Sequence, residues 1–200
     1  MEPIVALRTI HSVKVQLDDS SDWASALAGE GEGFGRIFDR HSARLLRHSR
    51  RLVTEPADAD DVVAITFLEA WRSRSRLRLV DGSVLPWLLV TATNVASNRN
   101  RSVRRYRALL ARLPAAEPSR DLTGVAEGTE ASDALGRLSL ADRRVVVLCV
   151  LEGYSEREAA DALGVPPGTV KSRLSRAKQR LRDQLDSPQS PNTLAEEAGQ

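Results

Sequence analysis

The stretch SEREAADALGVPPGTVKSRLSRAKQRLR, residues Ser155–Arg182, contains the start signals, the turn and the apolar spacing of two consecutive helices. Ser155 and Glu158 have the spacing of a capping box, in which the hydroxyl and the carboxylate satisfy each other's backbone amides at a helix start. Gly164 can end that helix in a left-handed cap. The two prolines that follow cannot continue a helix but can begin one. The stretch therefore predicts a helix, a short turn and a second helix.

The second helix of this pair runs from Gly168 onward and combines a buried stripe with a cationic outer surface. Apolar side chains recur at the i, i+4, i+7 and i+11 spacing of one helix face, at Val170, Leu174, Ala177 and Leu181. Between Asp161 and Asp183 the sequence contains no acidic residue. The outer surface of this helix therefore carries charge of one sign.

Together, these features predict a helix-turn-helix, which places its second helix in the major groove of DNA. The side chains that we expect to contact bases or phosphates are Thr169, Lys171, Ser172, Arg173 and Arg176. A solvated basic helix in an ordinary bundle is the alternative. The coincidence of cap, turn, stripe and charge favours the DNA-binding interpretation.

The composition is that of a soluble globular chain rich in helix-forming residues. Hydrophobic residues make up 42% of the 200 residues, charged residues 28% and aromatic residues 4%. The abundance of Leu, Ala and Arg favours helices, so we expect an all-α fold of two small helical domains joined by a flexible linker. The formal net charge of +2 hides a segregation of charge, since no acid occurs between Asp81 and Glu117.

The chain is expected to remain in the cytoplasm. Its single cysteine, Cys149, excludes an internal disulfide and lies in an apolar run, which predicts a buried, unreactive thiol. No apolar run approaches the ~20 residues that cross a membrane. Charged residues also interrupt the N-terminus where a signal peptide needs an apolar core. We therefore expect no membrane insertion.

Composition shifts along the chain predict its domain boundaries. Proline, glycine and mixed polar residues mark residues 107–131 as a linker, helical at most at its beginning. We expect an N-terminal domain over residues 22–106 and the helix-turn-helix domain over residues 132–186. A flexible extension over residues 1–21 and a disordered tail over residues 187–200 complete the chain.

The beginning of the N-terminal domain is expected to contain two helices. From Asp22, which we expect to cap the first, apolar residues recur at helical spacing, and Gly29–Gly35 is expected to separate the two. His41 and His48 fall on or near the apolar stripe and have no Cys or carboxylate partner at metal-ligand spacing. We expect both to pack in the core, and we expect no metal, no cofactor and no catalytic residue.

The next helix is expected after Thr54–Asp61, where clustered acids favour a helix start because of the helix dipole. One face is apolar and predicts core packing, whereas the opposite face exposes Ile65 and Leu68 within a charged rim, which suggests a protein partner. The residues of this candidate docking face are Asp58, Asp61, Ala64, Ile65, Leu68 and Glu69. The same spacing is equally consistent with Ile65 and Leu68 covering another helix of the domain.

A third long helix is expected from Pro86 to about Tyr106, after the turn signal Asp81-Gly82. Its outer face is polar and cationic and is suited to a nucleic-acid backbone, with amide side chains that can hydrogen-bond to bases. The candidate contacts are Asn94, Ser97, Asn98, Arg101, Arg104 and Arg105.

The run VVVLCVL, residues Val145–Leu151, is compatible with a buried strand because it is short and β-branched. A capping box at Ser139–Asp142 precedes it, and its neighbours are rich in helix formers. These two observations favour a buried helix.

Three blocks of the chain resemble bacterial sigma factors of the extracytoplasmic function class. The first is DADDVVAITFLEAW at Asp58–Trp71, and the second is PWLLVTATNVASNRNRSVRR at Pro86–Arg105. The third spans Leu138–Leu185 and includes the helix-turn-helix. The likeness extends from Asp22 to Leu185 with the blocks in the right order, which is more specific than a lone helix-turn-helix.

The resemblance implies a role for each block. The first block is similar to the helix that docks on core RNA polymerase, the second to the helix that reads and opens the minus-ten promoter element, and the third to the domain that reads the minus-thirty-five element. In this role, the Asp81–Leu85 loop before the second block would offer a place where a flipped base of the minus-ten strand could lodge. The implied function is promoter-specific transcription initiation, with core polymerase and double-stranded and melted promoter DNA as partners. An anti-sigma factor is a further implied partner, and the resemblance implies no enzymatic activity.

Two other functions compete with this interpretation. A stand-alone helix-turn-helix regulator that binds DNA without polymerase would share the C-terminal domain. Such a protein normally carries a phosphoacceptor βαβ domain, whereas the N-terminal half of this chain shows no alternation of strands and helices. A nucleic-acid hydrolase would need a catalytic or metal constellation, and three scattered histidines with separated carboxylates provide none.

Overall fold

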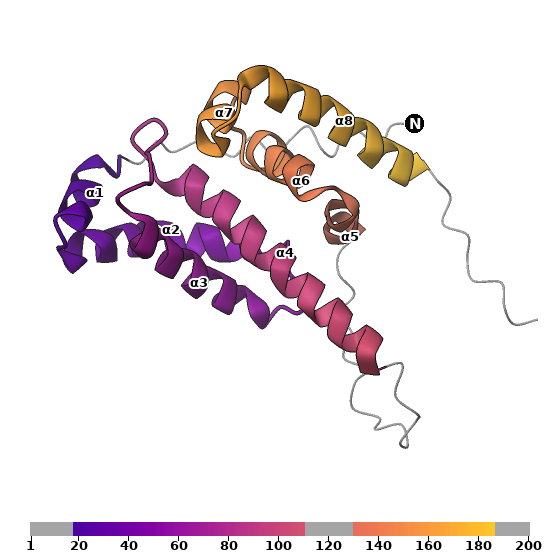
Figure 1. The fold of residues 1–200 in the computed structure, drawn as a ribbon, viewed down its shortest axis with the longest axis horizontal. Coiled ribbons are helices and arrows are strands. Elements are labelled where there is room, and N and C mark those ends of the chain that lie inside the picture. The colour runs from indigo at the N-terminus through magenta and orange to yellow at the C-terminus, as the bar shows by residue number, and fades with distance from the viewer. Residues whose placement is uncertain (1–17, 111–129, 187–200) are drawn as a thin grey trace, which may run out of the picture.

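The structure is a computed structural model that describes residues 18–110 and 130–186, and the described residues are almost entirely helical (Figure 1). The N-terminal helices are α1 (Ser20–Leu27), α2 (Gly31–Arg50), α3 (Asp58–Ser73) and α4 (Leu85–Leu110). The C-terminal helices are α5 (Glu130–Arg137), α6 (Leu140–Val146), η3 (Val147–Leu151), α7 (Glu156–Leu163) and α8 (Pro167–Asp186). Within these ranges no strand occurs beyond an isolated bridge between Val80 and Ser83. The expected all-α fold is confirmed.

Three expectations concern residues whose structure is not described. The N-terminal extension up to residue 17, the linker over residues 111–129 and the tail from residue 187 lie outside the described residues. Of the helices that are described, none has the length and apolar character needed to cross a membrane.

The four N-terminal helices pack around a core that α2, α3 and α4 share. Helix α2 packs against α1, α3 and α4, and α3 packs against α4. Ile37 and Leu45 from α2, Val62 from α3, and Leu88 and Leu89 from α4 are almost fully buried. This core holds α3 and α4 side by side, with their outer faces directed away from it.

The C-terminal helices confirm the local signals of the opening stretch. The Ser155 amide donates to the Glu158 carboxylate at 2.7 Å, and the Glu158 amide donates to the Ser155 hydroxyl at 3.2 Å, which completes the capping box. Gly164 ends α7 with a left-handed φ of 64°. Val170, Leu174 and Ala177 of α8 are buried, as their spacing predicts, whereas Leu181 at the end of the same stripe is half-buried.

The run VVVLCVL is helical, as expected, but it changes its winding. A π-helical turn, η3, follows α6 directly and spans Val147–Leu151. The Glu152 amide donates to the Val147 carbonyl at 3.0 Å, which is an i to i−5 bond and closes the wider turn. The turn buries Val147 and Leu148 and leads the chain toward the buried Glu152.

The start of α1 and the helix break after it differ from expectation. Helix α1 begins at Ser20 with Asp19 at its cap position, so Asp22 lies inside the helix and does not cap it. Only residues 28–30 separate α1 from α2, because most of the expected glycine break is helical. A Cβ at Gly33 would lie 2.5 Å from the Asp22 carbonyl oxygen, so this glycine permits close packing of α1 on α2 and does not break the helix. Helix α4 also continues past Tyr106 to Leu110.

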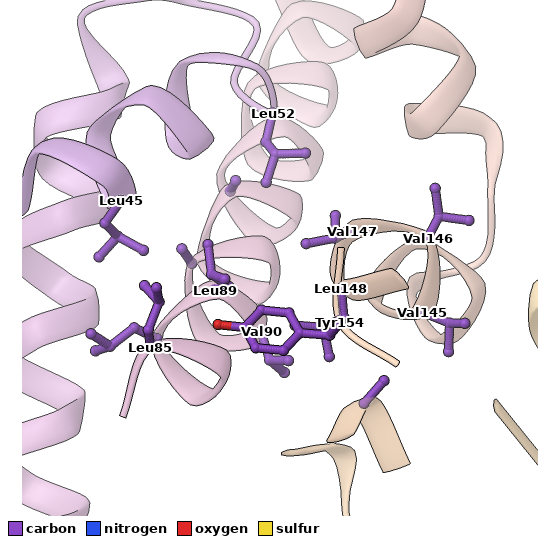
Figure 2. Packing of buried hydrophobic residues seen from close by; sticks show 14 of the residues in the cluster. Leu45, Leu52, Leu85, Leu89, Val90, Val145, Val146, Val147, Leu148 and Tyr154 are labelled. Atoms are coloured by element: carbon purple, nitrogen blue, oxygen red, sulfur yellow. The ribbon is translucent and has the colours of Figure 1, made fainter. Parts of the chain in front are cut away.

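The N-terminal and C-terminal helices pack against each other through α4. Helix α4 contacts α6, η3 and α7, and the buried side chains of both halves form one cluster. Figure 2 shows Leu89 and Val90 of α4 on the side that faces Leu148 and Tyr154. The structure is therefore a closed arrangement of the two halves, in which one side of α4 is covered.

Candidate nucleic-acid and partner interfaces

The N-terminal half of α8 presents the expected cationic surface. Lys171, Ser172 and Arg176 are exposed, whereas Thr169 and Arg173 are half-buried. The Ser172 hydroxyl donates to the Thr169 carbonyl at 3.0 Å, and the Arg176 Nε donates to the Ser172 carbonyl at 3.3 Å. These bonds stay within the helix, so the surface could meet DNA without first breaking a contact to another element.

Arg180, near the C-terminal end of α8, has a partner within the chain. Arg180 donates to the Asp142 carboxylate at 2.7 Å, which ties α8 to the first turn of α6. Asp142 is buried, and its amide also donates to the Ser139 hydroxyl, which caps α6, at 3.1 Å. Arg180 therefore holds the helix-turn-helix domain together and is not placed for DNA.

Two of the six candidate contacts on α4 are covered by the C-terminal half. The Arg144 Nε donates to the Asn94 amide oxygen at 2.6 Å, and the Arg143 Nη1 donates to the Ser97 hydroxyl at 2.6 Å. Arg143 is itself buried and also donates to the Leu135 carbonyl at 2.7 Å. Asn94 and Ser97 thus already have partners within the chain in this closed arrangement.

Burial and neighbouring charge act on both of these guanidinium groups. Burial lowers the pKa of Arg143, and the positive charge of Arg104 lowers it further. Burial likewise lowers the pKa of Arg144, with a second contribution from Arg173. Both arginines stay charged, because even a lowered arginine pKa lies far above neutral pH. The contact between the halves therefore brings Arg143 close to Arg104, and this repulsion opposes closure, whereas Arg144 and Arg173 both lie in the C-terminal half.

The remaining candidates on α4 are exposed. They are Asn98, Arg101, Arg104 and Arg105. Asn98 lies on the α3 side, where it lines a shallow groove together with Ile65 and Asp61 of α3. The cationic part of the expected nucleic-acid face is thus accessible, and the groove places Asn98 next to the candidate docking face.

The candidate docking face on α3 is accessible at its apolar centre. Ile65 is 44% exposed and Leu68 is 46% exposed. Among the described residues both side chains are thus exposed to a large extent, which favours a protein partner over packing within the domain. Ala64 and Asp61 beside them are also exposed. An exposed apolar pair within a polar rim is typical of a protein-binding surface.

Two acidic members of that face are engaged within the chain. Asp58 is buried and accepts a hydrogen bond from Arg99 of α4 at 2.7 Å. The Glu69 carboxylate lies 3.3 Å from Arg72 on the next turn of α3. Asp58 therefore holds α3 to α4, and Asp61 is the more accessible acid for a partner.

Sequence reasoning missed a buried acid at the start of the fold. Asp19 is fully buried, although the sequence predicted a flexible extension there. Its carboxylate lies within 3.0 Å of the His41 Nε2 and also accepts hydrogen bonds from Arg40, Ser83 and the Val84 amide. Ser83 is 64 residues away along the chain, so no local pattern could have indicated this contact. The only local signal was the run of acids and serines from Asp18 to Asp22, which is typical of a helix start.

Asp19 remains ionised despite its burial. Burial acts to raise its pKa, but the hydrogen bonds from His41 and the Val84 amide outweigh that effect and lower the pKa from 3.8 to about 2. A carboxylate with a lowered pKa stabilises the fold above its ordinary pKa, and the contribution is lost as pH falls through the lowered value. The contribution of Asp19 to stability is therefore lost between about pH 4 and pH 2.

We expect the free energy of unfolding to fall by about 2 kcal/mol more in the wild type than in Asp19→Asn between pH 5 and pH 2. The amide cannot titrate, so the variant lacks this contribution at both pH values. Denaturant unfolding at the two pH values measures the difference. Asp39→Asn, at an exposed acid of α2, is the control and should keep the wild-type dependence. If the free energy of unfolding depends on pH equally in the wild type and in Asp19→Asn, the lowered pKa of Asp19 is contradicted.

A second missed acid joins the two halves. Glu152 is buried, and its Oε2 accepts hydrogen bonds from Arg44 at 2.7 and 3.0 Å. Its Oε1 lies 3.6 Å from the His48 Nδ1. Burial acts to raise the Glu152 pKa, yet the nearby His48 ring and the hydrogen bonds from Arg44 leave it below its ordinary value. An ionised carboxylate of the C-terminal half is therefore held in a cationic site on α2.

The two histidines are buried, as their spacing predicted. Each lies beside an acid that the sequence did not connect to it, His41 beside Asp19 and His48 beside Glu152. Cys149 is half-buried, and burial raises the pKa of its thiol to about 11. Among the described residues, no group of three or more His, Cys, Asp or Glu is arranged to hold a metal ion.

Two family models match the chain, and they divide it as the helices do. The model described as Sigma-70 region 2 matches residues 37–106, which contain α3 and most of α4. The model described as Sigma-70, region 4 matches residues 129–181, which contain the helix-turn-helix. The candidate docking face and the α4 contacts thus lie in region 2, and the α8 contacts lie in region 4.

Individual sigma factors are similar over most of the chain. The ECF RNA polymerase sigma factor SigM of Mycobacterium tuberculosis is 35% identical over 164 residues, which cover 82% of this chain and 82% of SigM. The RNA polymerase sigma factor CnrH of Cupriavidus metallidurans is 30% identical and covers 82% of this chain. A solved structure of CnrH in complex with the cytosolic domain of CnrY matches with a TM-score of 0.59 at 30% identity, over 84% of this chain and 97% of that one.

Sigma-70 regions 2 and 4 bind core RNA polymerase and promoter DNA, and this activity is not enzymatic. The matches to both regions, their order and the coverage of SigM agree with the surfaces described above. The chain belongs to the sigma-70 family, as an RNA polymerase sigma factor of the extracytoplasmic function class that directs transcription initiation.

Proposed function

We propose that this sigma factor directs promoter-specific initiation through three surfaces whose residues can be named. The α3 face centred on Ile65 and Leu68 binds core polymerase. The exposed part of α4, with Asn98 and the arginines that follow it, contacts the minus-ten element. The start of α8 reads the minus-thirty-five element in the major groove.

The observation that supports this assignment best is the accessibility of one apolar and two cationic surfaces in the expected regions. Ile65 and Leu68 are exposed in region 2, although apolar side chains of their size normally pack. Arg101, Arg104 and Arg105 extend along α4, and Lys171 and Arg176 extend along α8. Phosphate contacts by such cations position a protein on DNA, and side chains in the groove read the sequence.

The closed arrangement must open before all the proposed minus-ten contacts can form. Asn94 and Ser97 are bonded to Arg144 and Arg143, so melted DNA can reach them only after these bonds break. We infer that separation of the two halves accompanies promoter binding. Arg143 and Arg144 lose protein partners in that step, and DNA phosphates could replace them.

We also propose a cytoplasmic location and an inhibitory protein partner. A sigma factor works where core polymerase and promoters are, which is the cytoplasm of a bacterial cell. CnrH forms a complex with the cytosolic domain of CnrY. An anti-sigma factor that holds the two halves of this chain together would act on the same surfaces that core polymerase and DNA require.

Transcription with purified core polymerase and a promoter library tests the function. We expect promoter-dependent transcripts whose yield falls about tenfold for each of Lys171→Ala and Arg173→Ala, because each side chain could supply a base or phosphate contact. Lys178→Ala, at an exposed cation of the same helix outside the proposed site, is the matched control and should retain the yield. Sequence-specific DNA binding without polymerase, and without stimulated transcription, would instead show a stand-alone regulator.

A further inference from the structure

The turn that precedes α4 has a tight and unusual backbone. The Val80 amide donates to the Ser83 carbonyl at 2.9 Å, and the Ser83 amide donates to the Val80 carbonyl at 3.0 Å. Between them, Asp81 and Gly82 both adopt left-handed φ values, of 49° and 73°. A non-glycine residue in this region is uncommon and needs surrounding contacts to hold it. The turn is therefore a defined structure at the start of the minus-ten helix.

Asp19 supplies those contacts from another part of the chain. Its amide donates to the Gly82 carbonyl at 2.8 Å. Its carboxylate Oδ2 accepts the Ser83 hydroxyl and the Val84 amide, each at 2.9 Å. Backbone and side chain of one residue thus bind three consecutive residues of the turn.

The carboxylate is directed at the turn and not at its own helix. Asp19 occupies the cap position of α1 but makes no side-chain cap bond there, which is the usual use of an aspartate at that position. It instead accepts the amide of Val84, the residue immediately before α4. The Ser83 hydroxyl accepts the Leu85 amide at 3.2 Å. Asp19 and Ser83 together therefore satisfy amides at the start of α4.

A second layer of contacts fixes the carboxylate. The His41 Nε2 lies 2.9 and 3.0 Å from its two oxygens, and Arg40 donates to Oδ1. Both residues belong to α2, which also contributes the buried side chains of Ile37 and Leu45 to the core. The turn is thus connected through Asp19 to a helix that is anchored in the core. A shift of the carboxylate would move the turn, and the core restrains such a shift.

We propose that Asp19 is a positioning residue for promoter recognition, which holds the Asp81–Ser83 turn and the start of α4 in the geometry that receives an unpaired minus-ten base. This inference rests on the proposed role of α4 and of the turn before it. A pocket for a flipped base discriminates by contacts on the edge of that base. Its selectivity depends on how closely the surrounding backbone is held, because a small displacement lengthens every hydrogen bond.

The test measures open-complex formation by the holoenzyme on promoters that differ by single bases in the minus-ten element. We expect Asp19→Asn and Ser83→Ala each to reduce the preference at one base position by about tenfold, as expected for the loss of a hydrogen bond to a charged group. Ser83→Thr retains the hydroxyl and should restore the preference. The affinity for core polymerase should remain at the wild-type value in all three.

Asp22→Asn is the matched control. Asp22 accepts hydrogen bonds from Arg36 at 2.7 Å and from Arg40 at 2.6 Å, so it shares Arg40 with Asp19, but its carboxylate is bonded to α2 and not to the turn. A general loss of packing would affect both aspartate variants and would lower complex formation equally on every promoter. We expect Asp22→Asn to keep the base preference.

The outcomes separate the inference from the function on which it rests. Wild-type base preference in both Asp19→Asn and Ser83→Ala, or equal loss of preference in Asp22→Asn, would overturn the positioning role alone. If Asp19→Asn does not fold, the Ser83→Ala and Ser83→Thr pair decides the question. A wild-type holoenzyme that forms no promoter-specific complex would overturn the proposed function, and the positioning role with it.

Discussion

Replacing Ile65 and Leu68 together by Gln should weaken binding to core RNA polymerase by about 100-fold, because apolar anchors at the centre of an interface can each contribute 2 kcal/mol or more. Glutamine keeps a favourable helix propensity and a similar length, so α3 should remain folded. Both side chains are more than two-fifths exposed, and exposed substitutions change the free energy of unfolding by about 0.5 kcal/mol or less. The loss should therefore appear in binding and not in stability.

Binding of the labelled protein to core polymerase and its thermal unfolding measure the two effects separately. Leu27→Gln is the matched control, because Leu27 is 50% exposed but lies on α1, which packs on α2. Transcription should fall on every promoter alike, since the docking step precedes promoter recognition. Unchanged polymerase affinity in the double variant would show that the α3 face binds something else. A lowered melting temperature in that variant alone would point to a structural role.

Replacing Glu152 by Gln should shift the chain from the closed arrangement toward an open one by roughly 30-fold. Glu152 is the acid that Arg44 and His48 hold between the halves, and loss of one partner of a buried ion pair costs several kcal/mol. Arg44 is partly exposed, which reduces the expected cost to about 2 kcal/mol. Opening should release Asn94 and Ser97, so a single-stranded minus-ten oligonucleotide should bind more tightly.

Energy transfer between dyes at Glu32 and Lys178, in a Cys149→Ser background, reports the separation of the halves. Both positions are exposed, and they lie on α2 and α8. Asp142→Asn is the matched control, because it makes the same chemical change at a buried acid whose ion pair, with the exposed Arg180, lies within the C-terminal half. The control should leave energy transfer unchanged. If Glu152→Gln also leaves transfer and oligonucleotide affinity unchanged, Glu152 does not hold the halves together.

The local elements of the fold followed from short-range patterns. The capping box of α7, the left-handed Gly164 and the buried stripe of α8 each depend on residues within a few positions of one another, and all were confirmed. Periodicity alone did not decide whether Ile65 and Leu68 are exposed or packed against another helix. A helical pattern shows which residues share a face, but it does not show whether another element covers that face.

The errors arose where long-range contacts outweighed local signals. Asp22 had the appearance of a cap, but Asp19 takes that position because Ser83 and Val84 bind it across the fold. Glycine predicted a break before α2, whereas Gly33 allows α1 to approach closely. In both cases the deciding partner lies in a different element, and no periodic spacing connects the two.

By itself the sequence determined the helices, the helix-turn-helix and the two cationic faces, because caps, turns and stripes act over one or two helical turns. Only the tertiary structure decided which of those faces are accessible. Arg144 reaches Asn94 across 50 residues of sequence, and Arg44 reaches Glu152 across 108. Such contacts form because packing of α4 against the C-terminal half brings these groups together and removes them from water. Burial then requires each of them to have a partner.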